Sequence, residues 1–310
     1  MMRAFEKAFA KINLFLDVTA KRNDGFHEIK SIMQTVSLYD DLEICAERSD
    51  ETEISLSINL SEELRLHRAF DGELSSGEDN IVYKAARLYL EKAGISATLR
   101  MHLLKRIPIA AGLAGGSADA AAALRGLNAI FGVFSAAELC ELSAELGSDV
   151  PFCLVGGTAL CSGRGERLVN LSYTPDLHIV VSIGRERISA GAAYSALDAA
   201  FSDFDGTVKS DGGKILSSKG GECECESAKR ALKSAGECVY NIFEHSDMKE
   251  LSEVEKIKKS LRELGATATL MSGSGPSVFG IFSSKEQADL AVSALCEAGI
   301  FAAYARTVRY

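Results

Sequence analysis

One stretch of the sequence constrains the fold more than any other. In RIPIAAGLAGGSADAAAAL, residues 106–124, glycines at 112, 115 and 116 run directly into a series of alanines. A backbone without Cβ atoms can adopt positive φ and bring its N–H groups close to a bulky ligand, and alanine is the strongest helix former. The preceding residues, 97–108, have the pattern of a strand. We therefore expect a strand, a glycine loop and a helix in direct succession.

The residues after the loop predict how that helix begins and ends. Ser117 has the character of an N-cap, Asp119 falls in the first turn, and Gly132 can end the helix. The loop would then present N–H groups at the positive end of the helix macrodipole, which favours phosphate. A tight strand-to-helix turn packed in a core would need the same glycines, so the loop alone leaves both interpretations open.

Two common phosphate-binding loops do not match. A Walker A loop needs a GK[ST] sequence, which is absent from this stretch. A dinucleotide fingerprint would open a βαβ unit with a ribose-binding acid about 20 residues further on, and GLAGGS lies near the middle of the chain without either. A third kind of phosphate site is needed.

Composition limits the classes of protein. The chain has 310 residues, 47% of them hydrophobic, which is enough for a sizeable core and more consistent with two domains than with one. Its net charge of −9 argues against a nucleic-acid surface. Apolar runs are too short for a membrane span, no signal peptide is visible, and the eight cysteines are scattered. We expect a cytoplasmic protein with neither nucleic-acid nor membrane partners.

In the first half, strand and helix patterns alternate. Apolar alternation predicts a strand over 8–18, on which Lys11 and Asn13 share the polar face. A helix is expected over 80–92, with Gly94 as its end. Further on, SAAE at 135–138 has the spacing of a capping box at the start of another helix.

The second half has a different pattern. Residues 177–183 read as a buried strand, and 202–227 are rich in glycine, serine and charge without periodicity, which predicts a mobile surface loop. The remaining chain predicts a helix over 252–264, with Ser252 and Glu255 as a capping box, followed by strand, turn, strand, helix and strand. This order suits an antiparallel sheet with helices on one face.

Several of these motifs together resemble the GHMP kinase superfamily. PIAAGLAGGSADAAAAL is similar to its ATP-binding motif, and LMSGSGPSVFGIF at 270–282 to its third motif, a glycine turn near the phosphates. AKINLFLDV, RNDGFHEI and LGSDVPFCLVGGTALCSGRGE resemble the group within it that acts on a diphosphocytidyl derivative of methylerythritol. The resemblance spans nearly the whole chain and is weakest at 59–77 and 202–235.

The resemblance implies an α+β, two-domain GHMP kinase fold. A ribosomal-protein-S5-like domain would occupy residues 1–165 and a ferredoxin-like domain residues 166–310, with the active site in the cleft. The implied activity is ATP-dependent phosphorylation of a hydroxyl of the diphosphocytidyl substrate in the non-mevalonate isoprenoid pathway. Another small-molecule kinase of the superfamily, acting on homoserine or mevalonate, is the alternative. We expect ATP and Mg²⁺ as cofactors and a monomer or weak homodimer.

Catalytic roles follow from the same resemblance. Lys11 matches the active-site lysine and Asp149 the catalytic aspartate, while Asn13 matches a position that contacts the substrate. Phosphoryl transfer needs a cation beside the acceptor and an acid that orients or deprotonates the hydroxyl, so the residue types suit the chemistry. From the sequence pattern alone, Lys11 could lie on a solvated strand face, and Asp149 could be the N-cap of a helix.

Three aromatic residues are candidates for binding the cytosine. His27 matches a substrate-binding position, although it could equally cap the NDGFH turn. Phe26 stands where tyrosine is common in the group, and it would keep stacking on the base but lose a phenolic hydrogen bond. Tyr194 resembles a second stacking aromatic, and as an alternative it is a core residue of a helix over 189–201.

The nucleotide site is expected along the glycine loop. Backbone N–H groups there would hold the phosphates, Asn80 and Lys105 would lie near the adenosine, and Ser117 would also reach Mg²⁺. The full set of nucleotide-binding candidates is Asn80, Lys105, Pro108, Ala110, Ala111, Gly112, Leu113, Ala114, Gly115, Gly116, Ser117 and Ala118. The GSGPS sequence at 273–277 can at the same time be a simple hairpin turn.

Overall fold

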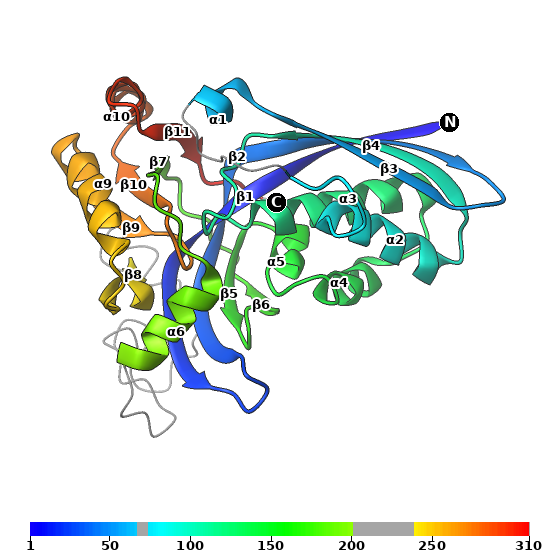
Figure 1. Ribbon diagram of the computed structural model, residues 1–310, viewed down its shortest axis with the longest axis horizontal. Helices are drawn as coiled ribbons and strands as arrows, with labels where there is room; N and C mark the ends of the chain where they lie inside the picture. The colour runs from blue at the N-terminus through cyan, green and yellow to red at the C-terminus, as the bar shows by residue number, and fades with distance from the viewer. Residues whose placement is uncertain (67–73, 201–238, 310) are drawn as a thin grey trace. The chain divides into compact units, whose positions relative to one another are not determined.

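The computed structural model describes residues 1–66, 74–200 and 239–309, in which strands and helices are mixed (Figure 1). The strands are β1 (Met2–Lys21), β2 (His27–Arg48), β3 (Glu53–Leu60), β4 (Ala97–Lys105), β5 (Thr158–Ser162), β6 (Arg167–Asn170), β7 (His178–Ile183), β8 (Tyr240–Asn241), β9 (Ala268–Met271), β10 (Val278–Phe282) and β11 (Phe301–Arg306). The helices are α1 (Glu62–Leu66), α2 (Ile81–Ala93), α3 (Gly115–Phe131), α4 (Ala136–Ala144), α5 (Val150–Val155), α6 (Ala190–Ala200), η1 (Ile242–His245), α9 (Leu251–Glu263) and α10 (Lys285–Glu297). The surface loop predicted at 202–227 lies outside the described residues.

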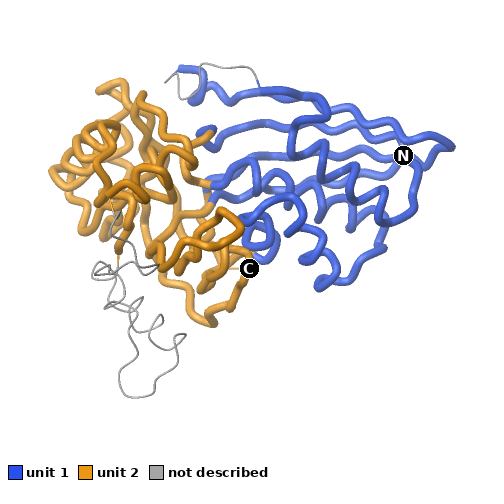
Figure 2. Tube along the Cα trace, turned by 60° about the horizontal axis from the view of Figure 1, so that its bottom comes forward, with its two compact units in different colours: residues 1–10, 38–109, 114–155 blue, residues 11–37, 110–113, 156–310 orange. Residues whose placement is uncertain are grey.

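The chain divides into two compact units, coloured separately in Figure 2. Unit 1 comprises residues 1–10, 38–109 and 114–155, and unit 2 comprises residues 11–37, 110–113 and 156–310. Both units are therefore assembled from several segments, and β1 and β2 contribute residues to each. The domain limits expected from the sequence, 1–165 and 166–310, stay a prediction.

In unit 1, helices lie on one side of a sheet (Figure 1). Strand β4 pairs in parallel with β3 and antiparallel with β2. Along β4, buried residues alternate with more exposed ones, as in a strand with one face in the core. Helices α2 and α3 pack together, and the hydroxyl of Tyr89 donates to the side chain of Asn128 over 3.0 Å.

Helix ends in unit 1 follow the sequence closely. The amide oxygen of Asn80 accepts a bond from the N–H of Val82 and caps α2, while Gly94 ends it in the left-handed conformation. Ser135 and Glu138 form the predicted capping box of α4. These predictions are confirmed because each cap satisfies backbone groups that the helix leaves without partners.

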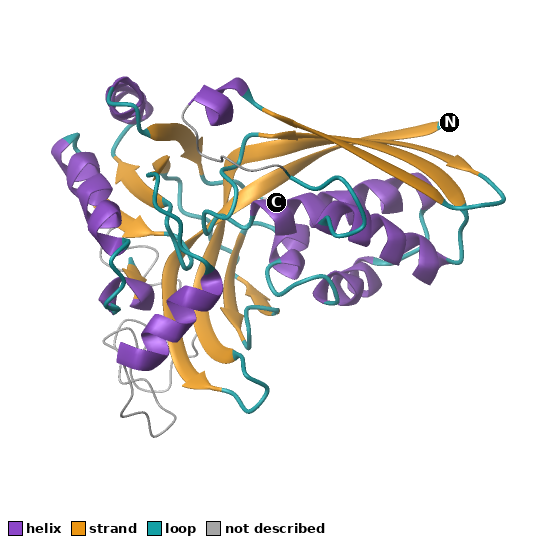
Figure 3. Ribbon diagram, viewed as in Figure 1, coloured by secondary structure: helices purple, strands orange, loops and turns teal. Residues whose placement is uncertain are grey.

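Unit 2 contains a four-stranded antiparallel sheet in the order β11-β7-β10-β9 (Figure 3). Apolar residues of α6, α9 and α10 share a core cluster with those of β7, β9 and β10, so the predicted antiparallel sheet with packed helices is confirmed. In the same unit, β5 pairs with β2 and β6, and β8 pairs with β1. The predicted capping box at Ser252 is wrong, because α9 already begins at Leu251 and Glu255 binds the ammonium of Lys258 at 2.8 Å.

Candidate functional site

The glycine loop joins β4 to α3 and starts the helix earlier than predicted. Ala114, with φ of 55°, is the N-cap and provides no side-chain bond, and Gly115 is the first helical residue. Ser117 is therefore the third residue of α3 and Asp119 the fifth, so both were placed wrongly as N-cap and first-turn residue. The left-handed turn at Ala114 directs the chain into the helix without a side-chain cap. The predicted end at Gly132 is confirmed.

Left-handed backbone recurs through the loop. Ala110, Gly112 and Ala114 have φ values of 52°, 77° and 55°. Glycine adopts this region without cost, whereas alanine there costs about 1–2 kcal/mol. Strain of this kind persists only where the surroundings fix the backbone, and it is concentrated at binding sites. The path leaves the N–H groups at the start of α3 without intrahelical acceptors, as an anion site requires.

The tip of the loop is bonded to the GSGPS turn, which lies far from it in the sequence. The carbonyl of Ala111 accepts from both the backbone N–H and the hydroxyl of Ser277, and the carbonyl of Gly112 accepts from the hydroxyl of Ser272 at 3.1 Å. A Cβ on Gly112 would lie 2.1 Å from the carbonyl oxygen of Ser272. Glycine is therefore required at 112 by close packing as well as by its positive φ.

The GSGPS sequence is also the hairpin turn between β9 and β10. The N–H of Ser272 donates to the carbonyl of Ser277 over 2.9 Å, and the N–H of Gly275 donates to the carbonyl of Ser272 over 3.0 Å. The hairpin interpretation and a contact with the glycine loop hold at the same time.

Within unit 1, a buried charge cluster joins the end of β4 to α3. The ammonium of Lys105 donates to Asp119 at 2.5 Å and to Asp40, and Asp40 also accepts from the N–H of Ile107 at 2.8 Å. All three charged side chains are at most 4% exposed. A Cβ on Gly115 would lie 3.4 Å from this ammonium. The cluster thus fixes the end of β4 against the first turns of α3.

Burial and charge set the ionisation of this cluster. Burial alone would lower the pKa of Lys105, but the carboxylates of Asp119 and Asp40 outweigh it and raise that pKa. Burial, together with the charge of Asp40, raises the pKa of Asp119 well above its usual range although Lys105 opposes this. The second oxygen of Asp119, Oδ1, is buried and has no hydrogen-bond partner among the described residues.

Two of the predicted nucleotide contacts have other partners in the structure. The side chain of Lys105 lies on the two carboxylates, and the side chain of Asn80 caps α2. Sequence reasoning missed Asp40, because nothing in its neighbourhood on the chain indicates a partner 65 residues away. A role for Asn80 or Lys105 beside the adenosine stays a prediction.

Lys11 is buried on β1, which excludes the solvated strand face considered for it. Lys11 is only 4% exposed, and its ammonium donates to the amide oxygen of Asn13 over 2.7 Å. Asn13 donates in turn to the hydroxyl of Ser31 over 2.7 Å. The backbone N–H of Lys11 donates to the carbonyl of Leu113 over 3.1 Å. The structure thus joins the backbone of Lys11 to the glycine loop at Leu113 and its side chain to Asn13.

Asp149 directly precedes α5 and belongs to unit 1. Its carbonyl accepts from the N–H of Cys153 over 3.0 Å, so the helix start predicted there is confirmed. The residue is half-buried.

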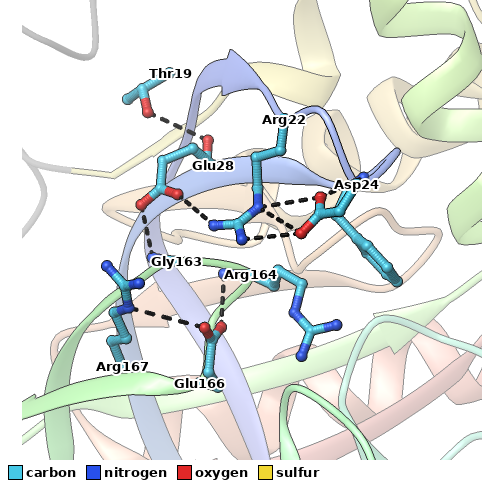
Figure 4. Close-up of polar contacts among 9 residues, drawn as sticks. Thr19, Arg22, Asp24, Glu28, Gly163, Arg164, Glu166 and Arg167 are labelled. Atoms are coloured by element: carbon cyan, nitrogen blue, oxygen red, sulfur yellow. Dashed lines mark hydrogen bonds and ion pairs between the residues drawn. The ribbon is translucent and has the colours of Figure 1, made fainter.

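A network of side chains shapes the hairpin between β1 and β2 (Figure 4). The guanidinium of Arg22 donates to Asp24 and to Glu28, each at 2.9 Å, and Glu28 also accepts from the N–H of Gly163 at 2.9 Å. The bonds from Arg22 hold the pKa of Asp24 below its usual value. The carboxylate of Asp24 also accepts from the N–H of Phe26, so the network sets the backbone just before His27.

The aromatic residues of this region lie in two separate contacts. Phe26 is 51% exposed, and the guanidinium of Arg164 lies 4.7 Å from its ring centroid. His27 instead stacks on Tyr194 of α6, with ring centroids 4.6 Å apart, and the ring of Tyr194 lies perpendicular to that of Phe243, at 89°. Tyr194 therefore packs against the core and stacks on His27, and its role as an aromatic that stacks on the base stays a prediction.

One polar partner in this region was not anticipated from the sequence. Asp198, one turn after Tyr194 on α6, lies 2.7 Å from Nε2 of His27 and 2.5 Å from the ammonium of Lys21. Burial would raise the pKa of Asp198, but the bonds from Lys21 and His27 outweigh it and lower the pKa.

The parts of the chain that the structure describes contain no group of three or more His, Cys, Asp or Glu side chains that could hold a metal ion. Across the same residues, no helix is long and apolar enough to cross a membrane.

Comparison with known proteins gives two matches to family models. Residues 80–157 match the N-terminal domain of GHMP kinases, and residues 226–300 match their C-terminal domain. The first match includes the glycine loop and Asp149, and the second includes the GSGPS turn.

Similar proteins of known name cover nearly the whole chain. The 4-diphosphocytidyl-2-C-methyl-D-erythritol kinase of Caldicellulosiruptor saccharolyticus is 40% identical over 283 residues, which are 91% of this chain and 89% of that protein. The kinase of the same name from Bacillus subtilis is 39% identical over 90% of this chain and 88% of its own.

Solved structures agree with this. A crystal structure of 4-(cytidine 5'-diphospho)-2C-methyl-D-erythritol kinase matches with a TM-score of 0.74 and 30% identity, covering 99% of this chain and all of that one. The mevalonate kinase of L. major in complex with R-mevalonate has a TM-score of 0.68 at only 15% identity, over 98% of this chain and 95% of its own, and so shares the fold alone.

Proposed function

Because this chain belongs to the GHMP kinases and, within them, to the 4-diphosphocytidyl-2-C-methyl-D-erythritol kinases, we propose that it phosphorylates that substrate. The protein is a small-molecule kinase with the α+β GHMP kinase fold, and it uses ATP. The products are the 2-phosphate and ADP, in the non-mevalonate pathway of isoprenoid synthesis. A homoserine or mevalonate kinase is not favoured, because the solved homoserine kinase of Cytophaga hutchinsonii is 19% identical to this chain and the mevalonate kinases of L. major and Methanococcus jannaschii are 15% and 12% identical.

The observation that carries the nucleotide site is the bonding of the glycine loop to the GSGPS turn. Ala111 and Gly112 accept bonds from Ser277 and Ser272, so two phosphate-binding motifs of the superfamily meet in one place. We assign the phosphates of ATP to N–H groups of the loop and of the first turn of α3, where the macrodipole favours negative charge. The Lys105 cluster supports this assignment, because the bond from Lys105 to Asp119 fixes the first turns of α3 against the end of β4.

Lys11 and Asp149 are proposed to act on the acceptor hydroxyl. A buried ammonium, such as that of Lys11, is a strong source of positive charge for a developing alkoxide or a transferring phosphoryl group. Asp149 would accept or orient the proton of the hydroxyl as it attacks. Asn13, which binds the ammonium of Lys11, would hold it in place.

For Mg²⁺, the residues present fit the usual requirement. This ion takes only one or two protein ligands in such sites and the rest from phosphate and water, so it does not need the cluster of three or more acidic, cysteine or histidine side chains that the described residues lack. The hydroxyl of Ser117, in the first turn of α3, is the residue proposed to hold it. When bound, the ion neutralises phosphate charge. A cytoplasmic location and a monomer or weak homodimer remain predictions.

The test measures ADP release with ATP and Mg²⁺ against 4-diphosphocytidyl-2-C-methyl-D-erythritol, homoserine, mevalonate, galactose and no acceptor. Turnover should be confined to the first, and Asp149→Asn should lower kcat by about 10²–10⁴-fold with the KM for ATP little changed. The matched control is Glu145→Gln. Glu145 is an exposed acid that, like Asp149, precedes α5 in the sequence, and this variant should retain kcat.

Two results would contradict the proposal. Turnover with another acceptor would reassign the substrate while leaving the kinase fold. Full activity of Asp149→Asn with the diphosphocytidyl substrate would remove Asp149 from the mechanism.

A further inference from the structure

Asp198 belongs to none of the sequence motifs shared with the GHMP kinases, yet it contacts His27, a predicted substrate-binding residue. It is on α6, 171 residues after His27, and the two side chains are 2.7 Å apart. Figure 1 shows α6 beside the ends of β1 and β2, which belong to the same unit. The side chain of His27 is 8% exposed and that of Asp198 35% exposed, so the pair is at the edge of the packed core.

The bond fixes where the proton on His27 lies. An ionised carboxylate can only accept, and the bonds from Lys21 and His27 keep Asp198 ionised by lowering its pKa. Nε2 of His27 therefore carries a hydrogen and donates it to Asp198. Nδ1 is the ring nitrogen left for a ligand, and among the described residues it has no hydrogen-bond partner.

The stack with Tyr194 fixes the plane of the ring. The His27 and Tyr194 rings are inclined by 22° with centroids 4.6 Å apart, and Tyr194 also packs perpendicular to Phe243, with ring centroids 4.9 Å apart. A ring held on one face and at one nitrogen presents its other nitrogen in a single direction. Such fixed geometry lets one hydrogen bond discriminate between ligands.

We propose that Asp198 is a positioning residue for base recognition: it holds His27 so that Nδ1 meets the hydrogen-bonding edge of a cytosine. This inference rests on the proposed function, in which His27 contacts the base. Cytosine and uracil reverse donor and acceptor at both the 3 and 4 positions of the ring. When the neutral ring holds its hydrogen on Nε2, Nδ1 is an acceptor, and it matches the 4-amino group of cytosine but not the 4-carbonyl oxygen of uracil. A ring free to move its hydrogen to Nδ1 would match either group.

A purely structural role is the competing explanation, since Asp198 also joins α6 to β1 through Lys21. Such a role would lower stability without altering which base is preferred. The two explanations therefore differ in the ratio of cytidine to uridine substrate use, and in whether KM or kcat changes.

The experiment compares the full-length enzyme with Asp198→Asn and with Lys21→Met, which removes the other bond of Asp198. Asparagine can donate or accept, so it no longer fixes the proton on Nε2. We expect Asp198→Asn to raise the KM for the cytidine substrate about tenfold and to lower its preference over the uridine analogue about tenfold, with kcat and the KM for ATP within about twofold. Lys21→Met should leave both substrate constants within about twofold of wild type.

Three further measurements separate the proposed role from a loss of folding. Thermal unfolding checks that each variant is folded, and Asp198→Glu, which retains a carboxylate, should recover part of the preference. Nitrogen-15 NMR of the His27 ring in the full chain should show a hydrogen on Nε2 in wild type and its exchange between the two nitrogens in Asp198→Asn.

An unchanged base preference in Asp198→Asn overturns the inference, as does an equal loss in Lys21→Met, which would assign a structural role. Failure of the proposed function is separate and visible in the wild type. A wild-type enzyme that ignores the diphosphocytidyl substrate refutes both proposals, whereas one that uses it while Asp198→Asn is unaffected refutes this one alone.

Discussion

The glycine loop and the β1–β2 hairpin are held in different ways. At the loop, main-chain carbonyls of Ala111 and Gly112 accept bonds from Ser277 and Ser272 of the turn between β9 and β10, and the charged cluster that joins β4 to α3 is buried. At the hairpin, the ion pairs of Arg22 with Asp24 and Glu28 join side chains that are 30–45% exposed. One region is fixed by backbone and buried charge, and the other by surface side chains.

This difference corresponds to what each region is proposed to bind. Phosphate groups are the same in every ATP molecule, and a backbone cradle suits a ligand part that never changes. A base that must be told from its analogues needs side chains whose donors and acceptors can be chosen. Exposed ion pairs contribute little to stability, so the hairpin can be altered for selectivity without endangering the fold.

The largest expected effect on stability is at the buried cluster of Lys105, Asp40 and Asp119. Lys105→Met would leave Asp40 and Asp119 buried without their cation, and we expect the free energy of unfolding to fall by about 3–5 kcal/mol. Urea unfolding measures it, with Lys92→Met, at an exposed ion pair, as the control that should change little. A small loss for Lys105→Met would show that the loop is not held by buried charge.

The same cluster should make stability depend on pH with a definite sign. The pKa of Asp119 is raised in the folded protein, so between its ordinary and its raised value the folded state binds more protons than the unfolded state. The contribution of Asp119 to stability is therefore present at low pH and is lost as pH rises through that window. Asp119→Asn should remove this part of the pH dependence when unfolding curves of the two proteins are compared from about pH 4 to pH 8.

The next effect is at the contact between loop and turn. Gly112→Ala would place a methyl 2.1 Å from the carbonyl oxygen of Ser272, at a residue with φ of 77°, so we expect a loss on the order of 3 kcal/mol and a large rise in the KM for ATP. Gly132→Ala is the matched control, with φ of 66° and no atom within 4 Å of the new Cβ. It should cost only the left-handed penalty, about 1 kcal/mol. Equal losses for the two variants would mean that the contact with Ser272 contributes nothing.

These contrasts explain what the sequence could predict. Gly132, Gly94 and the Ser135 box act through local backbone geometry, which a few neighbouring residues determine, and the helix ends that they define were predicted correctly. The antiparallel sheet of unit 2 followed in the same way from the order of its strand and helix patterns.

Long-range partners could not be predicted, because charge pairs carry no spacing signal. The sequence around Lys105 does not indicate Asp40 as its partner, and the sequence around His27 does not indicate Asp198. The two residues of each pair belong to elements that lie far apart in the sequence. The start of α3 was also misplaced. Serine is a common N-cap, but here Ala114 begins the helix in a left-handed conformation that a sequence pattern does not favour.

The smallest effect compares the backbone of the two regions directly. The loop has alanine at a left-handed position, Ala114, whereas the hairpin has glycine, Gly25, with φ of 84°. Ala114→Gly should therefore raise the free energy of unfolding by about 0.5–1 kcal/mol, and Gly25→Ala, whose new Cβ meets no atom within 4 Å, should lower it by about 1 kcal/mol. Because glycine at 114 also loosens the start of α3, the stabilised variant should bind ATP more weakly, measured by calorimetry. Unchanged affinity together with higher stability would show that the strain at Ala114 does not serve the phosphate site.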